Sequence, residues 1–263
     1  MAQTLAEIRE ALKAANRAEY EALARALAAD ERKGVKAALK SAARRLAAED
    51  AEAARLEGMY SFQAKLAGGG IAVGLDEVGR GPVAGPLAIG AVVLPDDPRV
   101  EGVNDSKQLS AERREEIAAV VREVAIAWDI EYIQPQEIDE HGMTWALRTA
   151  NLRAIAAIEE QLSAKGASLD AVLLDGNAQH LDAREVNIVK GDGKCASIAA
   201  ASIIAKVDRD ALMCRYAERF PHYGFESNKG YASAEHIEAI KQYGLSPVHR
   251  ASFCRAWTQE TLF

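Results

Sequence analysis

The sequence contains few of the residues that mark secreted or membrane-bound proteins. Only three of its 263 residues are cysteines, Cys195, Cys214 and Cys254, and their wide spacing fits neither a disulfide framework nor a zinc site. No apolar run reaches about 18 residues, so we expect no membrane span. Residues 1–14 carry acids and bases every few positions, so we expect no signal peptide. These absences predict a protein of the reduced cytoplasm.

The sequence also lacks an excess of basic residues. Its 32 Lys and Arg stand against 39 Asp and Glu, which gives a net charge of −7. This balance argues against a generally basic nucleic-acid binder but is compatible with a local basic groove. No GxxxxGK[ST] segment occurs, which excludes a P-loop. The histidines have no metal-like spacing, and we expect them to lie at the surface or to form hydrogen bonds: His141, His180, His222, His236 and His249.

Residues 1–66 differ in composition from the remainder. They contain no proline, are rich in Ala, Glu, Lys and Arg, and show helical periodicity that begins at a capping box formed by Thr4 and Glu7. This segment has 12 basic against 10 acidic residues, so the remainder has 20 against 29. We expect a small all-helical extension over residues 1–67, either a solvated packing module or a substrate-binding aid. Gly68-Gly69-Gly70 is typical of a linker, which places a second domain at 71–263.

After the glycines, apolar runs alternate with helical patterns. We predict strands at 71–75, 87–94, 125–133, 169–174 and 186–189. Helices are expected over most of 135–162, over about 196–220 and over 235–243. The small residues of the second helix indicate close packing of that helix on a sheet. This order predicts an α/β fold with a mixed sheet flanked by helices.

Carboxylates follow three of the predicted strands. Asp76 and Glu77 end the first strand, Asp175 ends the fourth, and Asp192 comes shortly after the fifth. Each Asp-Gly pair alone is typical of a simple turn. If the strands are neighbours, however, the four carboxylates converge, and such a group needs cations to stay ionised. Two divalent ions about 3.5–4 Å apart would satisfy them and would suit phosphodiester hydrolysis.

A dinucleotide-binding interpretation of the same region fails on its context. Gly79-x-Gly81-x-x-Ala84 follows a strand and superficially matches the fingerprint. That fingerprint must open a helix, whereas Pro82 and Pro86 prevent one here. A second strand follows instead, so we exclude a nucleotide-cofactor domain.

Several blocks together resemble the ribonuclease HII family. The most specific is Gly74-Leu75-Asp76-Glu77-Val78-Gly79-Arg80-Gly81-Pro82, and order and spacing agree over roughly 71–255. The further blocks are 104–109 (NDSKQL), 174–177 (LDGN), 189–192 (VKGD), 200–207 (AASIIAKV), 229–231 (KGY) and 249–253 (HRASF). Gln108 departs from the lysine of many relatives, which weakens a phosphate contact there. The helical extension resembles the longer bacterial members.

This resemblance implies a ribonuclease H-like fold and an endoribonuclease that uses two Mg²⁺ or Mn²⁺ ions, and we expect a monomer. Its substrates would be RNA–DNA hybrids and duplex DNA with embedded ribonucleotides. It implies that Asp76, Glu77, Asp175 and Asp192 bind the metals. It also implies that a further set binds the substrate, with its glycine-flanked arginine sensing the ribose 2′-hydroxyl: Gly79, Arg80, Gly81, Lys107 and Tyr231.

Other interpretations remain open at this point. A non-catalytic hybrid-binding module would retain Arg80 and Tyr231 but lose acids, and all four acids are present. A different metal-dependent nuclease or a phosphatase would not require a 2′-hydroxyl in its substrate. Lys190, Lys194, Lys206 and Lys229 are further candidates for phosphate contacts. The tail 258–263 suggests a peptide ligand for a replication clamp, but the sequence identifies no such partner.

Overall fold

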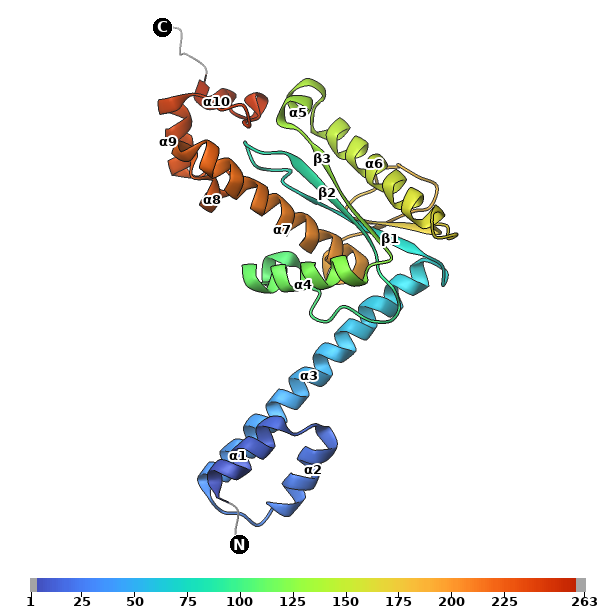
Figure 1. Ribbon diagram of the computed structural model, residues 1–263, viewed down its shortest axis with the longest axis vertical. Coiled ribbons are helices and arrows are strands. Elements are labelled where there is room, and N and C mark those ends of the chain that lie inside the picture. Colours follow the sequence, from blue (N-terminus) through green and yellow to red (C-terminus); the bar gives the residue numbers. More distant parts are fainter. Residues whose placement is uncertain (1–3, 259–263) are drawn as a thin grey trace. The chain divides into compact units, whose positions relative to one another are not determined.

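The structure, a computed structural model, describes residues 4–258, and the chain forms two compact units, Met1–Glu57 and Gly58–Phe263. The boundary between the units falls inside helix α3 (Lys33–Leu66). Unit 1 contains α1 (Leu5–Ala14), α2 (Arg17–Ala26) and the first part of α3 (Figure 1). The predicted helical extension is therefore confirmed.

Two capping boxes begin the first two helices of unit 1. Thr4 and Glu7 satisfy each other's backbone N–H groups at the start of α1, and Asn16 and Glu19 do the same for α2. Apolar side chains on one face of each helix then pack together. The buried core of the unit consists of Ile8, Leu12, Val35 and Ala42. Unit 1 thus has a small core of its own.

The last turns of α3 pack inside unit 2. The side-chain Oε1 of Gln63 accepts a hydrogen bond of 2.9 Å from the backbone N of Ser197, in the first turn of helix α7 (Ala196–Arg219). This N–H has no partner within its own helix, so Gln63 acts as a cap supplied from another segment. The helix α3 then ends where the backbone N of Gly69, at a φ of 81°, donates to the carbonyl of Ala64 at 2.9 Å.

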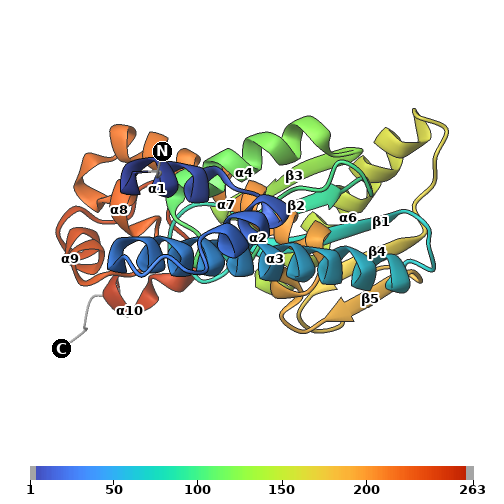
Figure 2. The same ribbon diagram turned by 90° about the horizontal axis from the view of Figure 1, so that it is seen from below.

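Unit 2 is built on a five-stranded mixed sheet with the order β3-β2-β1-β4-β5. The strands are β1 (Ala72–Val78), β2 (Leu87–Val93), β3 (Ala127–Ile133), β4 (Ala171–Asp175) and β5 (Glu185–Ile188). Strands β1, β2 and β3 pair antiparallel, whereas β4 runs parallel to β1 and β5 parallel to β4. Figure 2 shows β1, β4 and β5 in succession. The predicted mixed sheet is confirmed.

Helices cover both faces of this sheet (Figure 1). Helix α6 (Met143–Ser163) packs on β2 and β3, and α7 packs on β1 and β2 with α4 (Ala111–Val124) beside it. The main core lies under α6, where Val73 and Leu75 of β1 meet residues such as Ile155 and Ile158. The predicted helix over 135–162 is broken at Gly142, which has a φ of 83° and separates α5 (Pro135–His141) from α6.

Two glycines let α7 approach the sheet closely. A Cβ atom added to Gly74 would lie 2.3 Å from the backbone N of Ile198, and one added to Gly90 would lie 2.3 Å from the carbonyl O of Ala201. No side chain fits at those distances. The expectation that the small-residue helix packs tightly on the sheet is therefore confirmed.

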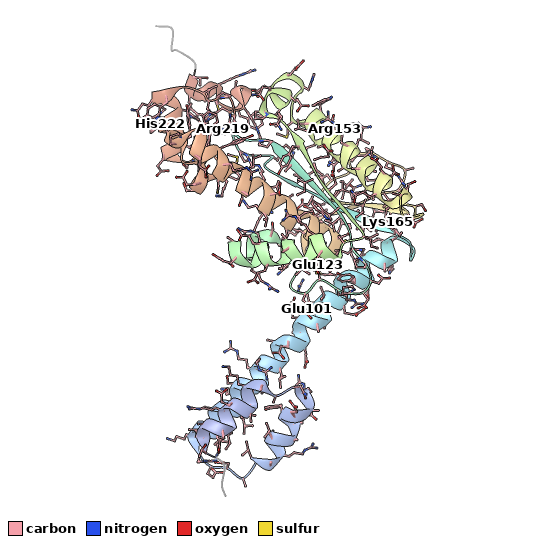
Figure 3. All side chains as sticks on the ribbon, viewed as in Figure 1. Glu101, Glu123, Arg153, Lys165, Arg219 and His222 are labelled. Carbon is pink, nitrogen blue, oxygen red and sulfur yellow. The ribbon has the colours of Figure 1, made fainter. Side chains whose placement is uncertain are left out.

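The C-terminal part of unit 2 adds α8 (Phe225–Asn228), α9 (Ala234–Tyr243) and α10 (Arg255–Thr258). Short 3₁₀ turns complete the chain: Ser106–Gln108, Gly191–Gly193, Pro221–Tyr223 and Ala251–Phe253. Charged side chains such as Glu123, Arg153 and Lys165 lie exposed on the outer elements (Figure 3). Within residues 4–258, no helix combines the length and apolar character that a membrane crossing needs. All but the first residue of the predicted clamp-binding tail lies outside the described residues.

Candidate active site

Two neighbouring central strands bring three of the predicted acids together. Leu75 of β1 pairs with Leu174 of β4, and the strands run parallel, so the next residues, Asp76 and Asp175, come side by side at one edge of the sheet. Glu77 follows Asp76 on the same strand. The carboxylates of Asp76, Glu77 and Asp175 interact electrostatically, which indicates that they share one site.

The alternation of β1 directs its two acids to opposite faces of the sheet. Asp76 lies on the α7 side, where its carboxylate accepts hydrogen bonds from Ser202 of α7 and from the backbone N of Glu77, the latter at 2.8 Å. Glu77 lines a cavity together with Thr144 and Leu147 of α6. The two carboxylates therefore border different parts of the same cleft.

Asp192 reaches the site through the turn after β5. The backbone N of Gly191 donates a hydrogen bond of 2.6 Å to Oδ1 of Asp175, and this fixes the 3₁₀ turn Gly191–Gly193 against the end of β4. Asp192 is 9% exposed and interacts electrostatically with Asp175, Asp105 and Lys107. Of the other three predicted acids, Asp192 therefore interacts with Asp175.

Burial and mutual repulsion make these carboxylates harder to ionise. Burial raises the pKa of Asp76 to about 7, and the charges of Glu77 and Asp175 add to the effect. Burial also raises the pKa of Glu77, although Arg80, at 3.5 Å from its carboxylate, opposes the rise. The pKa of Asp192 is raised by burial and by the charges of Asp105 and Asp175. The site therefore favours a bound cation.

The chemistry of the donor set fits a hard divalent ion, since clustered carboxylate oxygens are its preferred ligands. In the part of the chain that the structure describes, no three acid, histidine or cysteine side chains already surround a common ion position. The carboxylates instead engage protein groups: Asp76 engages Ser202, Glu77 engages Arg80 and Asp175 engages Gly191. A carboxylate has two oxygens with several lone pairs, so these contacts orient the acids and still leave acceptor positions for an ion.

The predicted substrate-binding residues border the same cleft. A cavity of about 310 Å³ runs from the acids to residues 79–86, here called the glycine–arginine loop, and to Tyr231, which is 51% exposed. The ring of Tyr231 faces Gly81, where an added Cβ would lie 3.7 Å from its Cε1 atom. The cavity is lined by Asp76, Glu77, Val78, Gly79, Arg80, Gly81, Ser106, Lys107, Asp175, Ser202, Lys206 and Tyr231.

Of the lysines proposed for phosphate contacts, the structure brings only Lys107 and Lys206 to this cavity. Lys206 also forms an ion pair of 2.8 Å with Asp210. Lys194 and Lys229 direct their ammonium groups to backbone carbonyls elsewhere, those of Val189 and Glu226.

Two serines complete the cavity wall and were not predicted from the sequence. Ser106 and Ser202 are buried, and their hydroxyls lie 3.0 Å apart. In the sequence, Ser106 belongs to the block 104–109, and Ser202 lies among the small residues that indicate close helix packing. A small polar residue in an otherwise apolar helix face is the signal that could have identified Ser202.

Two buried arginines hold the glycine–arginine loop from behind. Arg250 donates to the carbonyls of Gly79 at 2.6 Å, Arg80 at 3.1 Å, Pro82 at 2.8 Å and Gly85 at 2.8 and 3.0 Å.

Arg209 donates to the carbonyls of Ala84 and Pro86 at 3.1 and 2.9 Å. Gly79 has a φ of 88°, and a Cβ there would meet Arg209 at 2.1 Å, so no other residue fits. Sequence patterns predicted no role for Arg209 and included Arg250 only within the block 249–253, because the carbonyls that they bind are far away along the chain.

A second cavity continues the cleft on the opposite side of the acids. It measures about 460 Å³ and shares Glu77, Arg80 and Asp175 with the first. Thr144 and Arg148 of α6 line it, together with residues 176–179. A polymer that passes over the acids would thus find polar groups on both sides.

A mixed sheet with helices on both faces is the architecture of ribonuclease H-like hydrolases. The sequence profile of the family described as Ribonuclease HII matches residues 73–256, and that of the Ribonuclease HII N-terminal domain matches residues 4–67. The chain therefore belongs to the ribonuclease HII family, whose members are type 2 ribonucleases H.

Relatives in sequence and structure agree with this assignment. The chain is 43% identical to a ribonuclease HII of Ruminiclostridium cellulolyticum over 80% of its own length and 81% of the relative's. It is 42% identical to a ribonuclease HII of Halalkalibacterium halodurans, over 86% and 84%. Among solved structures, the RNase HII of Archaeoglobus fulgidus, solved as a complex with PCNA, is 29% identical, with a TM-score of 0.59 over 73% of this chain and 98% of that one.

Proposed function

We propose that this enzyme cleaves the RNA strand of RNA–DNA hybrids and incises duplex DNA on the 5′ side of embedded ribonucleotides, leaving 3′-hydroxyl and 5′-phosphate ends. The observation that supports the proposal is a cleft lined by Asp76, Glu77 and Asp175 beside the glycine–arginine loop and Tyr231, with Asp192 in electrostatic contact with Asp175. Hydrolytic and ribose-sensing groups would thus be neighbours.

The four acids would hold two divalent ions, Mg²⁺ or Mn²⁺. When bound, such ions supply an activated water and stabilise the charge on the leaving oxygen. The protein contributes fixed positions for the carboxylates, since Ser202 orients Asp76 and Gly191 orients Asp175. Neutralisation of the buried acids by cations also removes the repulsion that raises their pKa values.

The glycine–arginine loop would recognise the ribose. Its carbonyls point inward to Arg250, so the outer side of the loop at Gly81 is left to face a substrate. Only glycine allows a sugar to approach the backbone this closely. Tyr231 would pack on the neighbouring sugar, and Lys107 and the guanidinium of Arg80, which is 64% exposed, would contact phosphates.

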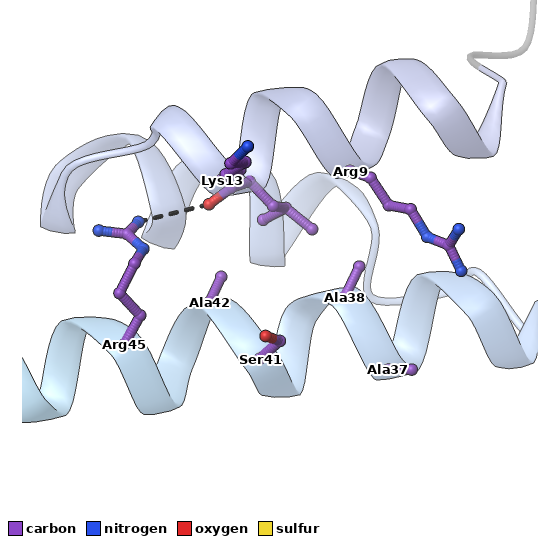
Figure 4. Close-up of a pocket in the computed structure, with 8 residues that line it drawn as sticks. Arg9, Lys13, Ala37, Ala38, Ser41, Ala42 and Arg45 are labelled. Carbon is purple, nitrogen blue, oxygen red and sulfur yellow. Dashed lines mark hydrogen bonds between the residues drawn. The ribbon is translucent and has the colours of Figure 1, made fainter.

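We further propose that unit 1 helps to bind the duplex. A cavity of about 370 Å³ lies between α1 and α3, and Figure 4 shows its alanine floor and its basic rim of Arg9, Lys13 and Arg45. No acidic residue lines it. Arg45 is held by the carbonyl of Ala15 at 2.6 Å and by Glu49, whereas Arg9 and Lys13 extend from the exposed face of α1. Cations above a floor of small residues suit a phosphodiester backbone.

Incision of a labelled duplex that carries one ribonucleotide tests the proposal. We expect cleavage on the 5′ side of the ribonucleotide with Mg²⁺ or Mn²⁺, none with EDTA, and none of the all-DNA duplex. Asp175→Asn should lower kcat by about 100-fold or more with the fold retained, because the site would lose a carboxylate ligand for the divalent ions.

Asp96→Asn is the matched control, since Asp96 is exposed outside the cleft, and it should leave the rate unchanged. Wild-type activity of Asp175→Asn in Mg²⁺ would contradict the site. Equal cleavage of the all-DNA duplex would favour a different nuclease, and binding without cleavage would favour a hybrid-binding module.

A further inference from the structure

The segment His249-Arg250 has no role in the chemistry described so far, although it lies directly behind the cleft. Both side chains are buried, with 4% of His249 and 0% of Arg250 exposed. Their backbone is tied to the loop in front of them: the backbone N of Arg250 donates to the carbonyl of Val83 at 2.8 Å, and Ala84 and His249 form a β-bridge.

Arg250 faces the glycine–arginine loop. Its guanidinium donates to four carbonyls between Gly79 and Gly85, and no carboxylate forms an ion pair with it within the described residues. A planar group with several N–H donors fixes the path of such a loop as a point charge cannot. The loop conformation therefore depends on Arg250.

His249 faces the other way, toward Tyr231. Nδ1 of His249 accepts hydrogen bonds from Ser246, from the backbone N at 3.0 Å and from Oγ at 2.8 Å. Nε2 of His249 lies 3.0 Å from Nε2 of His236, and Nδ1 of His236 lies 2.7 Å from the carbonyl O of Tyr231.

The groups at the two ends of this series of hydrogen bonds determine which ring nitrogens carry protons. A backbone N–H only donates, so Nδ1 of His249 carries no proton and its Nε2–H donates to His236. A carbonyl only accepts, so Nδ1 of His236 carries the proton that reaches Tyr231. Burial lowers the pKa of both rings, that of His249 to about 4, which keeps the pair neutral as this arrangement requires. Each ring nitrogen then has a partner.

We propose that His249 and Arg250 form one positioning element that holds Tyr231 in register with the Gly79–Gly81 loop and thereby sets discrimination for the ribose 2′-hydroxyl. This inference rests on the proposed function. Neither residue lines the cleft, so neither is a catalytic residue. Each acts through its partner, Arg250 through the loop carbonyls and His249 through His236 and Tyr231.

The test compares two substrates across variants of the full chain. One duplex carries a single ribonucleotide and the other carries 2′-deoxy-2′-fluoro at that position, which cannot donate a hydrogen bond. His249→Phe keeps the ring volume beside Tyr223 and Phe225 but removes the donor to His236. We expect the ratio of kcat/KM for the ribonucleotide duplex to kcat/KM for the fluoro duplex to fall by about tenfold. The reason is that Tyr231 and the glycine–arginine loop would no longer be held in the arrangement that recognises the 2′-hydroxyl.

Three further variants separate positioning from general stability. His249→Gln retains an amide N–H near the Nε2 position and should restore most of the ratio. Arg250→Lys should lower it, because one ammonium cannot reach four carbonyls. His222→Phe makes the same ring exchange at an exposed histidine that stacks on Tyr243 at the periphery of unit 2 (Figure 3), and should leave the ratio unchanged.

The outcomes distinguish this inference from the proposed function. Equal loss on both substrates, with the ratio unchanged in folded His249→Phe, would overturn the positioning role. If His249→Phe does not fold, Ser246→Ala, which removes only one of the two donors to His249, decides the matter: a lowered ratio supports the role and an unchanged ratio overturns it. Failure of the wild type to cut the ribonucleotide duplex would instead overturn the proposed function.

Discussion

At the scale of single residues, the acids of the cleft are held in an unfavourable state that a cation would relieve. Asp76 is the most extreme, with a pKa raised to about 7 by burial and by the charges of Glu77 and Asp175. A group whose pKa is raised on folding stabilises the fold only while it is protonated, and that contribution is lost as the pH rises through the folded pKa. The metal-free protein should therefore carry its largest electrostatic cost above pH 7.

This cost predicts a gain in stability when the charge is removed. Asp76→Asn should raise the free energy of unfolding of the metal-free protein by about 2–3 kcal/mol at pH 8, and by much less at pH 5, where Asp76 is already neutral. Urea unfolding at the two pH values in EDTA measures this. Asp96→Asn, in an exposed loop, should change neither value. Absence of a gain at pH 8 would show that Asp76 is not under electrostatic strain.

At the scale of elements, the approach of α7 to β1 determines where the acids lie. Ser202 of α7 can reach Asp76 only because Gly74, two residues earlier on the same face of β1, leaves room for the helix backbone. The contact that packs α7 on β1 therefore also sets the position of Ser202 relative to Asp76. A change that pushes the helix outward should affect stability and activity together.

Gly74→Ala tests this coupling. The added methyl group would meet backbone atoms at 2.3 Å, so the helix must shift, and we expect a loss of about 1–3 kcal/mol in the free energy of unfolding together with a fall in kcat. Gly58→Ala is the control, since nothing lies within 4 Å of the added methyl and the site is helical. It should stabilise by about 0.5–1 kcal/mol. Equal effects of the two changes would contradict the role of close packing.

Local patterns predicted the five strands, most of the long helices and the four candidate acids, because strand alternation, helical periodicity and the ends of strands can be recognised in short windows of sequence. They did not predict α4. The same windows could not predict that Arg209 and Arg250 hold one loop, or that His249 forms a hydrogen bond with His236. Those contacts join segments that only the tertiary fold brings together. Gly142 shows the remaining limit, since one glycine inside a helical pattern predicts a break only weakly.

At the scale of the whole molecule, the chain combines two units of opposite charge balance. The extension is the less acidic part, and its basic cavity is formed by side chains of α1 and α3 alone. Substrate affinity and chemistry should therefore be separable by mutation. Changes confined to unit 1 should weaken binding without altering the cleavage step.

The double variant Arg9→Glu/Lys13→Glu should raise KM severalfold at physiological salt and leave kcat nearly unchanged. The slope of log Kd against log salt should also become shallower by about 1–2, as expected if one or two phosphate contacts are lost. Steady-state kinetics and salt titration of duplex binding measure these effects. Lys40→Glu/Arg44→Glu makes the same charge change on a different face of α3. Equal effects of both double variants would indicate a general electrostatic contribution instead of a site.

The hydrogen bond from Ser197 to Gln63 has a practical consequence for chimeras in which the N-terminal unit is replaced by that of a relative. Although the profile of the N-terminal family extends to residue 67, the final turns of α3 supply a cap that the catalytic unit uses. A chimera spliced at the glycines would discard this acceptor and expose an amide in the helix that carries Ser202. Exchanging the N-terminal module between relatives should therefore succeed when the splice lies before residue 58.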